Sequence, residues 1–144
     1  MAVGRLGGHA LRFHKRGRDG SAKADAFATG RAGDVVHGVI YEMTASAKVE
    51  LDRHEGLGSG YRERRVAIEC EDDGAVAAWV YQAEAAHVDD ALRPFTWYRA
   101  LVVAGARHHG FGDDYVAAVE AVEAADDPDR ERHAREMRVL TGRG

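Results

Sequence analysis

The strongest constraint on the fold of this chain is a change in the spacing of its apolar residues at Pro94. Upstream of Pro94 they alternate in short runs, as in β-strands, and downstream they recur at helical spacing. A length of 144 residues is typical of a single compact domain. Strands followed by helices are typical of the α+β class, so we predict a small mixed, mainly antiparallel β-barrel with flanking helices.

The clearest pair of strands is a hairpin over residues 61–83. In its first half Val66, Ile68 and Cys70 fall on one face, and the Asp-Asp-Gly sequence at 72–74 has the composition of a tight turn. The residues after this turn form a second, more apolar strand. The remaining predictions for this region are, in chain order, a strand over 6–13, a loop over 16–21 and a buried strand over 35–41.

Helices are predicted on both sides of the hairpin. The first has Thr44 or Ser46 as its N-cap and ends at Gly56. The later ones are, in chain order, a helix with Trp97, Leu101 and Ala104 on one face that ends at Gly110, a helix capped by Asp113 or Asp114 that stops at Pro128, and a charged helix or frayed end after it. We therefore assign residues 1–127 to the domain and 128–144 to a charged C-terminal helix or tail.

Composition narrows the class of protein. The chain has 20 basic and 24 acidic residues and a net charge of −4, which makes a dedicated nucleic-acid binder an unfavourable hypothesis. No stretch approaches the ~18 apolar residues of a membrane span, so we expect no membrane partner. A lone cysteine, Cys70, has no internal disulfide partner, and we therefore expect a reducing, cytoplasmic location and a packed thiol.

Several short motifs fail on their context. The glycines at 56, 58 and 60 lie between a predicted helix and a predicted strand, which is the reverse of a dinucleotide-binding turn. His54-Glu55 begins like a zinc-protease motif, but Gly58 occupies the position of its second histidine. The histidines are predicted to lie on the surface or in loops, and no metal site is expected.

The segment that carries a functional signal is residues 51–61. It places the carboxylate of Glu55 directly before a glycine-rich turn that leads into a strand. Glycines let a ligand approach the main chain closely. Two hypotheses follow. In the first, Glu55 only caps or solvates the end of a helix, and in the second it acts on a bound ligand.

The order and spacing of several segments resemble the γ-glutamylcyclotransferases and their γ-glutamylamine cyclotransferase relatives, the AIG2-like proteins. The matching segments are 4–21, 36–41, 51–61 and 78–81, followed by Tyr98, 105–107, Gly110 and Tyr115. The resemblance implies that Glu55 of the Leu-Asp-x-x-Glu-Gly motif is the catalytic acid/base and that Tyr98 contacts the substrate. It also implies that Gly56, Tyr61 and Tyr81 lie at the substrate pocket.

The activity implied by the resemblance is an intramolecular aminolysis. The α-amino group of a γ-glutamyl amino acid or amine attacks its own γ-carbonyl, which gives 5-oxoproline and releases the amine. Family members need no cofactor, and the expected partner is the small substrate, with a homodimer left open. The alternative interpretation of Tyr98 is an aromatic residue that only packs on a helix face.

One part of the family pattern has no counterpart in this chain. Family members carry a strand and a Tyr-Gly-Ser-Asn loop upstream of the position of Val3, where this sequence has only Met1 and Ala2. We expect a chain without them to be weakly active and to expose a strand edge that promotes self-association. Two other hypotheses are therefore retained: a catalytically impaired or non-catalytic binding domain of the same fold, and a deacylase that removes γ-glutamyl groups from a larger product.

Overall fold

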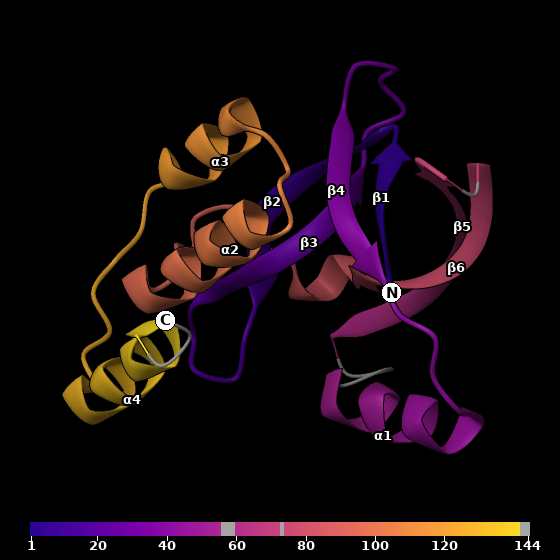
Figure 1. The fold of residues 1–144 in the computed structure, drawn as a ribbon. Helices are drawn as coiled ribbons and strands as arrows, with labels where there is room; N and C mark the ends of the chain where they lie inside the picture. Colours follow the sequence, from indigo (N-terminus) through magenta and orange to yellow (C-terminus); the bar gives the residue numbers. More distant parts are fainter. Residues whose placement is uncertain (56–59, 73, 142–144) are drawn as a thin grey trace.

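The computed structural model describes residues 1–55, 60–72 and 74–141. Their strands form a four-stranded sheet in the order β4-β1-β5-β6 and a separate two-stranded sheet, β2-β3 (Figure 1). The strands are β1 (Ala2–Gly7), β2 (His9–Arg16), β3 (Ala22–Ala28), β4 (Val35–Ile40), β5 (Tyr61–Cys70) and β6 (Gly74–Ala83). The helices are α1 (Ala45–Glu55), a 3₁₀ turn η1 (Ala85–His87), α2 (Thr96–His108), α3 (Asp113–Glu120) and α4 (Arg130–Thr141).

This arrangement confirms the α+β class but not the closed barrel. Strand β1 pairs with β5 through only two residues, Gly4 and Arg5, and β3 has no backbone ladder with β6. Instead, the side chain of Gln82 on β6 donates to the carbonyl of Ala26 on β3 at 3.0 Å. The described strands therefore remain as two antiparallel sheets, which side-chain contacts link at one edge.

The hairpin prediction is confirmed. Strands β5 and β6 pair continuously from Tyr61 opposite Ala83 to Cys70 opposite Gly74. The φ of Gly74 is +65°, the left-handed conformation that favours glycine at a tight turn. Cys70 is buried.

The prediction of a single strand over residues 6–13 is wrong. The backbone turns at Gly8, where φ is +72°. The N–H of Gly8 donates to the carbonyl of Asp34 at 2.8 Å, and its own carbonyl accepts a hydrogen bond from the N–H of Thr29 at 2.9 Å. These bonds fix the turn, so β1 enters one sheet and β2 enters the other.

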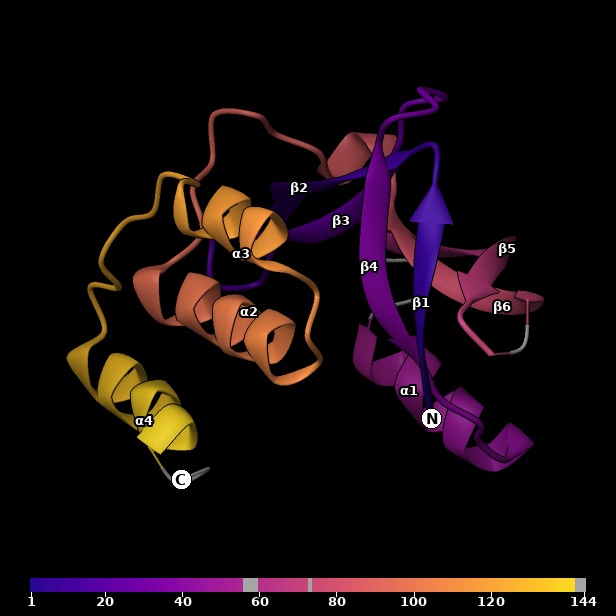
Figure 2. The same ribbon diagram turned by 45° about the horizontal axis from the view of Figure 1, so that its top comes forward.

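The hydrophobic core lies between two helices and the smaller sheet. Val103 and Ala106 of α2 pack against Val116 and Val119 of α3, and Phe13 of β2 packs against this cluster. Figures 1 and 2 show α2 and α3 side by side, with α1 separate from them at the far end of the larger sheet. None of the described helices is long and apolar enough to cross a membrane.

Two predicted helix ends differ from the structure. The N-cap of α3 is Gly112, with φ of +95°, and the predicted caps Asp113 and Asp114 lie in the first helical turn. Acidic side chains are favoured there because the N-terminus of a helix carries partial positive charge. Helix α3 also ends at Glu120, before Pro128 is reached.

Candidate active site

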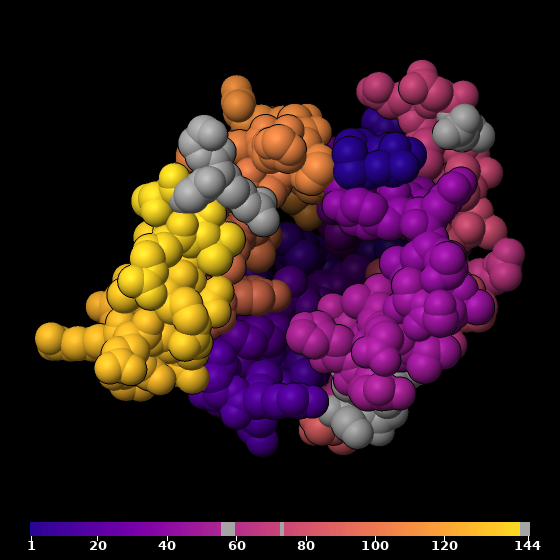
Figure 3. All heavy atoms as spheres, turned by 60° about the horizontal axis from the view of Figure 1, so that its bottom comes forward, coloured from indigo at the N-terminus to yellow at the C-terminus, as the bar shows by residue number. Residues whose placement is uncertain are grey.

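A cleft of about 1120 Å³ opens between α1 and α4. Figure 3 shows the molecule hollowed there, with α4 in yellow on one side and α1 in magenta on the other. The lining includes Lys15 from β2, Glu55 from α1, Tyr61 from β5, Tyr98 from α2 and Arg132 from α4. Segments far apart in the sequence therefore meet at this cleft. A second hollow of about 680 Å³ lies beside the start of α3 and holds none of the predicted site residues.

Glu55 is the last residue of α1 and is half-buried at the edge of the cleft. The helix is predicted correctly at its start, because Thr44 Oγ1 accepts a hydrogen bond from the N–H of Ala47 at 3.1 Å. A carboxylate does not stabilise the opposite end, since it cannot donate to the free carbonyls and lies at the negative pole of the helix dipole. No described residue forms an ion pair or hydrogen bond with Glu55. Glu55 therefore does not stabilise the end of α1, and its carboxylate is available to a ligand in the cleft.

The two cleft tyrosines form hydrogen bonds with the two backbone groups of a single residue, Ala24, on the outer edge of β3. The hydroxyl of Tyr61 donates to the carbonyl of Ala24 at 3.1 Å, whereas the hydroxyl of Tyr98 accepts a hydrogen bond from the N–H of Ala24 at 3.0 Å. The hydroxyl proton of Tyr61 is therefore already used in a hydrogen bond to the backbone. The proton of Tyr98 has no acceptor among the described residues and remains available for donation into the cleft.

Burial is the main reason that the pKa of each tyrosine is raised. The negative charge of Glu55 raises the pKa of both Tyr61 and Tyr98 further. Both hydroxyls therefore stay protonated at neutral pH. Tyr98 combines a free proton with proximity to the Glu55 charge, which are the properties of a hydrogen-bond donor to substrate.

Tyr81 does not line the cleft. Its hydroxyl donates to the carboxylate of Asp52 on α1, which also accepts a hydrogen bond from the ammonium of Lys48. The hydrogen bond from Lys48 is the main cause of a lowered Asp52 pKa. Lys48 also reaches Glu63 on β5 at 2.6 Å. Because α1 has no buried residue, these polar contacts attach the helix to the hairpin and so position Glu55 at its end. Gly56 lies outside the described residues.

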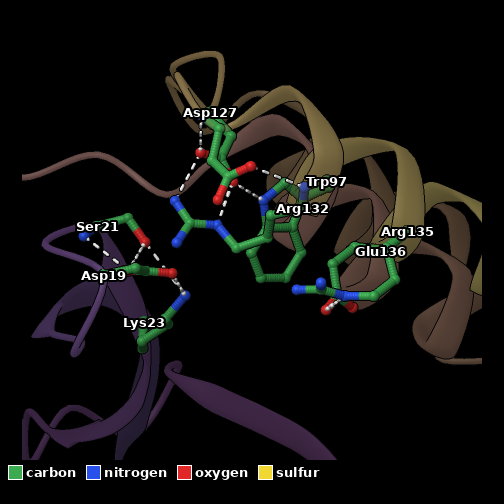
Figure 4. A network of polar contacts seen from close by, with 9 residues as sticks. Asp19, Ser21, Lys23, Trp97, Asp127, Arg132, Arg135 and Glu136 are labelled. Atoms are coloured by element: carbon green, nitrogen blue, oxygen red, sulfur yellow. Dashed lines mark hydrogen bonds and ion pairs between the residues drawn. The ribbon is translucent and has the colours of Figure 1, made fainter.

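The opposite wall of the cleft is a paired-charge network that the sequence did not reveal. The guanidinium of Arg132 donates two hydrogen bonds to Asp127, at 2.5 and 2.6 Å, and holds the pKa of that carboxyl far below its usual range. The indole N–H of Trp97 donates to the same carboxylate at 2.9 Å. Figure 4 shows this group facing Asp19 of the β2–β3 turn and Lys23 of β3. The predicted C-terminal tail therefore contributes a wall of the cleft.

His14 is another residue whose environment was not predicted from the sequence. It is 6% exposed, and its Nε2 lies 2.7 Å from a carboxylate oxygen of Asp25, so this histidine is not a surface or loop residue. The other carboxylate oxygen of Asp25 accepts a hydrogen bond from the N–H of Ala83 at 2.8 Å. These two contacts join β2, β3 and β6. The pair could not be predicted from the sequence, because nothing near His14 in the chain indicates Asp25 as its partner.

Comparisons with known proteins agree with this fold. Residues 35–119 match the AIG2-like family, whereas none of the curated proteins matches the chain. A gamma-glutamyl cyclotransferase structure is similar over 100% of this chain and 85% of its own, with a TM-score of 0.81 and 22% identity. An uncharacterised human protein is similar over 90% of this chain and 78% of its own (TM-score 0.75, 24% identity). YkqA from Bacillus subtilis is similar over 86% of this chain and 45% of its own (TM-score 0.70, 20% identity). The solved structures show a shared fold, and since the family match covers more than half of the sequence, the chain belongs to the AIG2-like family.

Proposed function

We propose that the protein is a γ-glutamylcyclotransferase-like enzyme that cyclises a γ-glutamyl amino acid or amine to 5-oxoproline and releases the amine. The observation that carries the proposal is that Glu55 and Tyr98 line the same cleft with groups ready to act. Among the described residues, the Glu55 carboxylate has no ion-pair or hydrogen-bond partner and the hydroxyl proton of Tyr98 has no acceptor. The likeness to a structure named gamma-glutamyl cyclotransferase supports the same reaction class.

In this mechanism Glu55 first takes a proton from the substrate α-ammonium. The amine nitrogen then attacks the γ-carbonyl carbon, which forms the ring C–N bond and places negative charge on the carbonyl oxygen. Tyr98 donates its free proton as a hydrogen bond to this oxygen or to the substrate beside it. As the oxyanion collapses, the original amide C–N bond breaks and Glu55 gives its proton to the departing amine. The ring nitrogen then loses its extra proton to the ionised Glu55, which passes it to the released amine, so the lactam is neutral and Glu55 is ionised again.

The tethering of nucleophile and electrophile explains why so few groups suffice. Effective molarities of well-oriented intramolecular reactions reach about 10⁵–10⁸ M, so the main task of the cleft is to fold the substrate. A base and a hydrogen-bond donor then complete the reaction. Every proton moved is carried by the substrate or by Glu55.

The direct test is release of 5-oxoproline from a panel of γ-glutamyl dipeptides and γ-glutamyl amines, with the amine product measured in parallel. The proposal requires equal amounts of both products from at least one substrate, and loss of both in Glu55→Gln. A folded protein that binds 5-oxoproline but releases none from any substrate in the panel would instead support a non-catalytic binding domain. Release that persists in Glu55→Gln would contradict the assigned base.

A further inference from the structure

Lys15 is a buried cation at the end of β2 that faces the cleft. The residue is only 9% exposed, and its ammonium nitrogen lies 4.4 Å from the centroid of the Tyr61 ring. Gly60 makes room for it, because a Cβ at that position would lie 2.9 Å from both Cε and Nζ of Lys15. The ring of Tyr61 and the missing side chain at Gly60 therefore leave a space that the Lys15 ammonium occupies.

All but one of the other lysines and arginines that line the cleft have carboxylate partners. Lys23 reaches Asp19 at 3.0 Å, and Arg132 is held by Asp127. The remaining pairs are Arg16 with Asp89 at 3.0 Å and Arg53 with Glu50 at 3.2 Å. Arg18 is exposed to solvent and needs no partner.

Lys15 has no such partner among the described residues. Burial lowers its pKa, and the charge of Glu55 opposes that effect from beyond ion-pair distance. A buried ammonium without a hydrogen-bonded counter-ion is unfavourable, because it loses the solvation that it has in water. A ligand carboxylate in the cleft would remove this cost.

We propose that Lys15 binds the α-carboxylate of the γ-glutamyl group, an inference that rests on the proposed function. The head group of an α-amino acid carries an ammonium and a carboxylate on one carbon. A site that holds both needs an anion and a cation close together, and Glu55 with Lys15 provides this pair in one cleft. The substrates are then γ-glutamyl compounds in which both the α-amino group and the α-carboxylate are free.

Binding of two small ring compounds tests the inference without turnover. 5-Oxoproline carries the carboxylate, whereas 2-pyrrolidinone is the same lactam without it. A hydrogen bond to a charged group predicts that the wild-type chain binds 5-oxoproline about 10- to 100-fold more tightly, as measured by calorimetry or NMR titration. Equal binding of the two compounds would overturn the inference, and this comparison requires no variant.

A matched pair of variants locates the effect. Lys15→Met keeps much of the side-chain length and should abolish the preference for 5-oxoproline. Arg12→Met is the control, because Arg12 is an exposed cation on the same strand that also lies over an aromatic ring, that of Phe27, but outside the cleft. It should retain the preference within about twofold. A Lys15→Met protein that retains the full preference would exclude Lys15 as the carboxylate ligand.

Turnover separates failure of this inference from failure of the proposed function. A γ-glutamyl dipeptide and its α-carboxamide analogue are compared, and the wild-type kcat/KM should favour the free acid by about 10- to 100-fold. Release of 5-oxoproline without discrimination between them would refute the role of Lys15 and leave the function intact. Absence of both turnover and 5-oxoproline binding would refute both.

Discussion

The two cleft tyrosines allow a prediction in which nearly identical substitutions have different effects on activity. Tyr98→Phe removes the acceptor of the Ala24 N–H, and Tyr61→Phe removes the donor to the Ala24 carbonyl. An unsatisfied, partly buried backbone group costs about 1–3 kcal/mol, so both variants should lose a similar part of the free energy of unfolding. Of the two tyrosines, Tyr98 is the one whose hydroxyl proton has no acceptor within the described part of the chain and can be donated to the substrate. We therefore expect Tyr98→Phe to lower kcat/KM by about 10- to 100-fold and Tyr61→Phe to change it by less than threefold.

Two measurements on the same preparations decide the matter. Urea denaturation gives the free energy of unfolding, and 5-oxoproline release gives kcat/KM at a temperature where both variants are folded. Equal loss of stability with unequal loss of activity is the expected pattern. If Tyr98→Phe is destabilised but as active as the wild type, its hydroxyl serves only β3. If both variants lose activity equally, the assignment of the two protons is wrong.

Three further predictions concern other parts of the site. Glu55→Gln should reduce turnover by about 10²–10⁴-fold in the 5-oxoproline assay with an unchanged circular dichroism spectrum, and a loss of less than threefold would remove it from the mechanism. Gly60→Ala should lower the free energy of unfolding by about 1–3 kcal/mol in urea, because φ there is +139° and the new Cβ would meet Lys15; unchanged stability would contradict the geometry. The lowered pKa of Asp127 means that its contribution to stability is complete above its unfolded pKa of about 3.9 and is lost as the pH falls towards the folded value. Thermal unfolding from pH 6 to pH 3 should therefore change less steeply in Asp127→Asn than in the wild type, and parallel curves would exclude this role.

The sequence predicted correctly those elements that are stabilised by residues close to them in the chain. The β5–β6 hairpin has alternating apolar residues and a turn with Gly74, and the start of α1 has a capping threonine, Thr44. Strand β3 was not predicted, because its alternating alanine and charged residues have little intrinsic strand preference. Side chains from β6, α2 and β5 hold it in place, and none of them is near it in the sequence.

The same distinction applies to the candidate site. Glu55, Tyr61 and Tyr98 were predicted from the resemblance to the AIG2-like proteins, and the structure brings all three to one cleft. Lys15 and Arg132 were not predicted, because a lysine in a strand and an arginine in a charged tail look like ordinary surface residues in a sequence. Their positions depend on how β2 and α4 pack. Tyr81 matched an aromatic position of the pattern but contacts the helix that carries Glu55 rather than the cleft.

The side-chain bonds along the outer edge of β3 also affect how the protein behaves in a crowded solution. An edge strand with free N–H and C=O groups can recruit a strand from another molecule and start aggregation. Here Tyr98 and Tyr61 occupy both backbone groups of Ala24, and Gln82 occupies the carbonyl of Ala26. An incoming strand would have to displace Tyr98 and Tyr61 from the cleft first. Protection against intermolecular β-pairing therefore depends on both hydroxyls, and that of Tyr98 also faces the substrate site, so selection for solubility and for catalysis would act together on Tyr98.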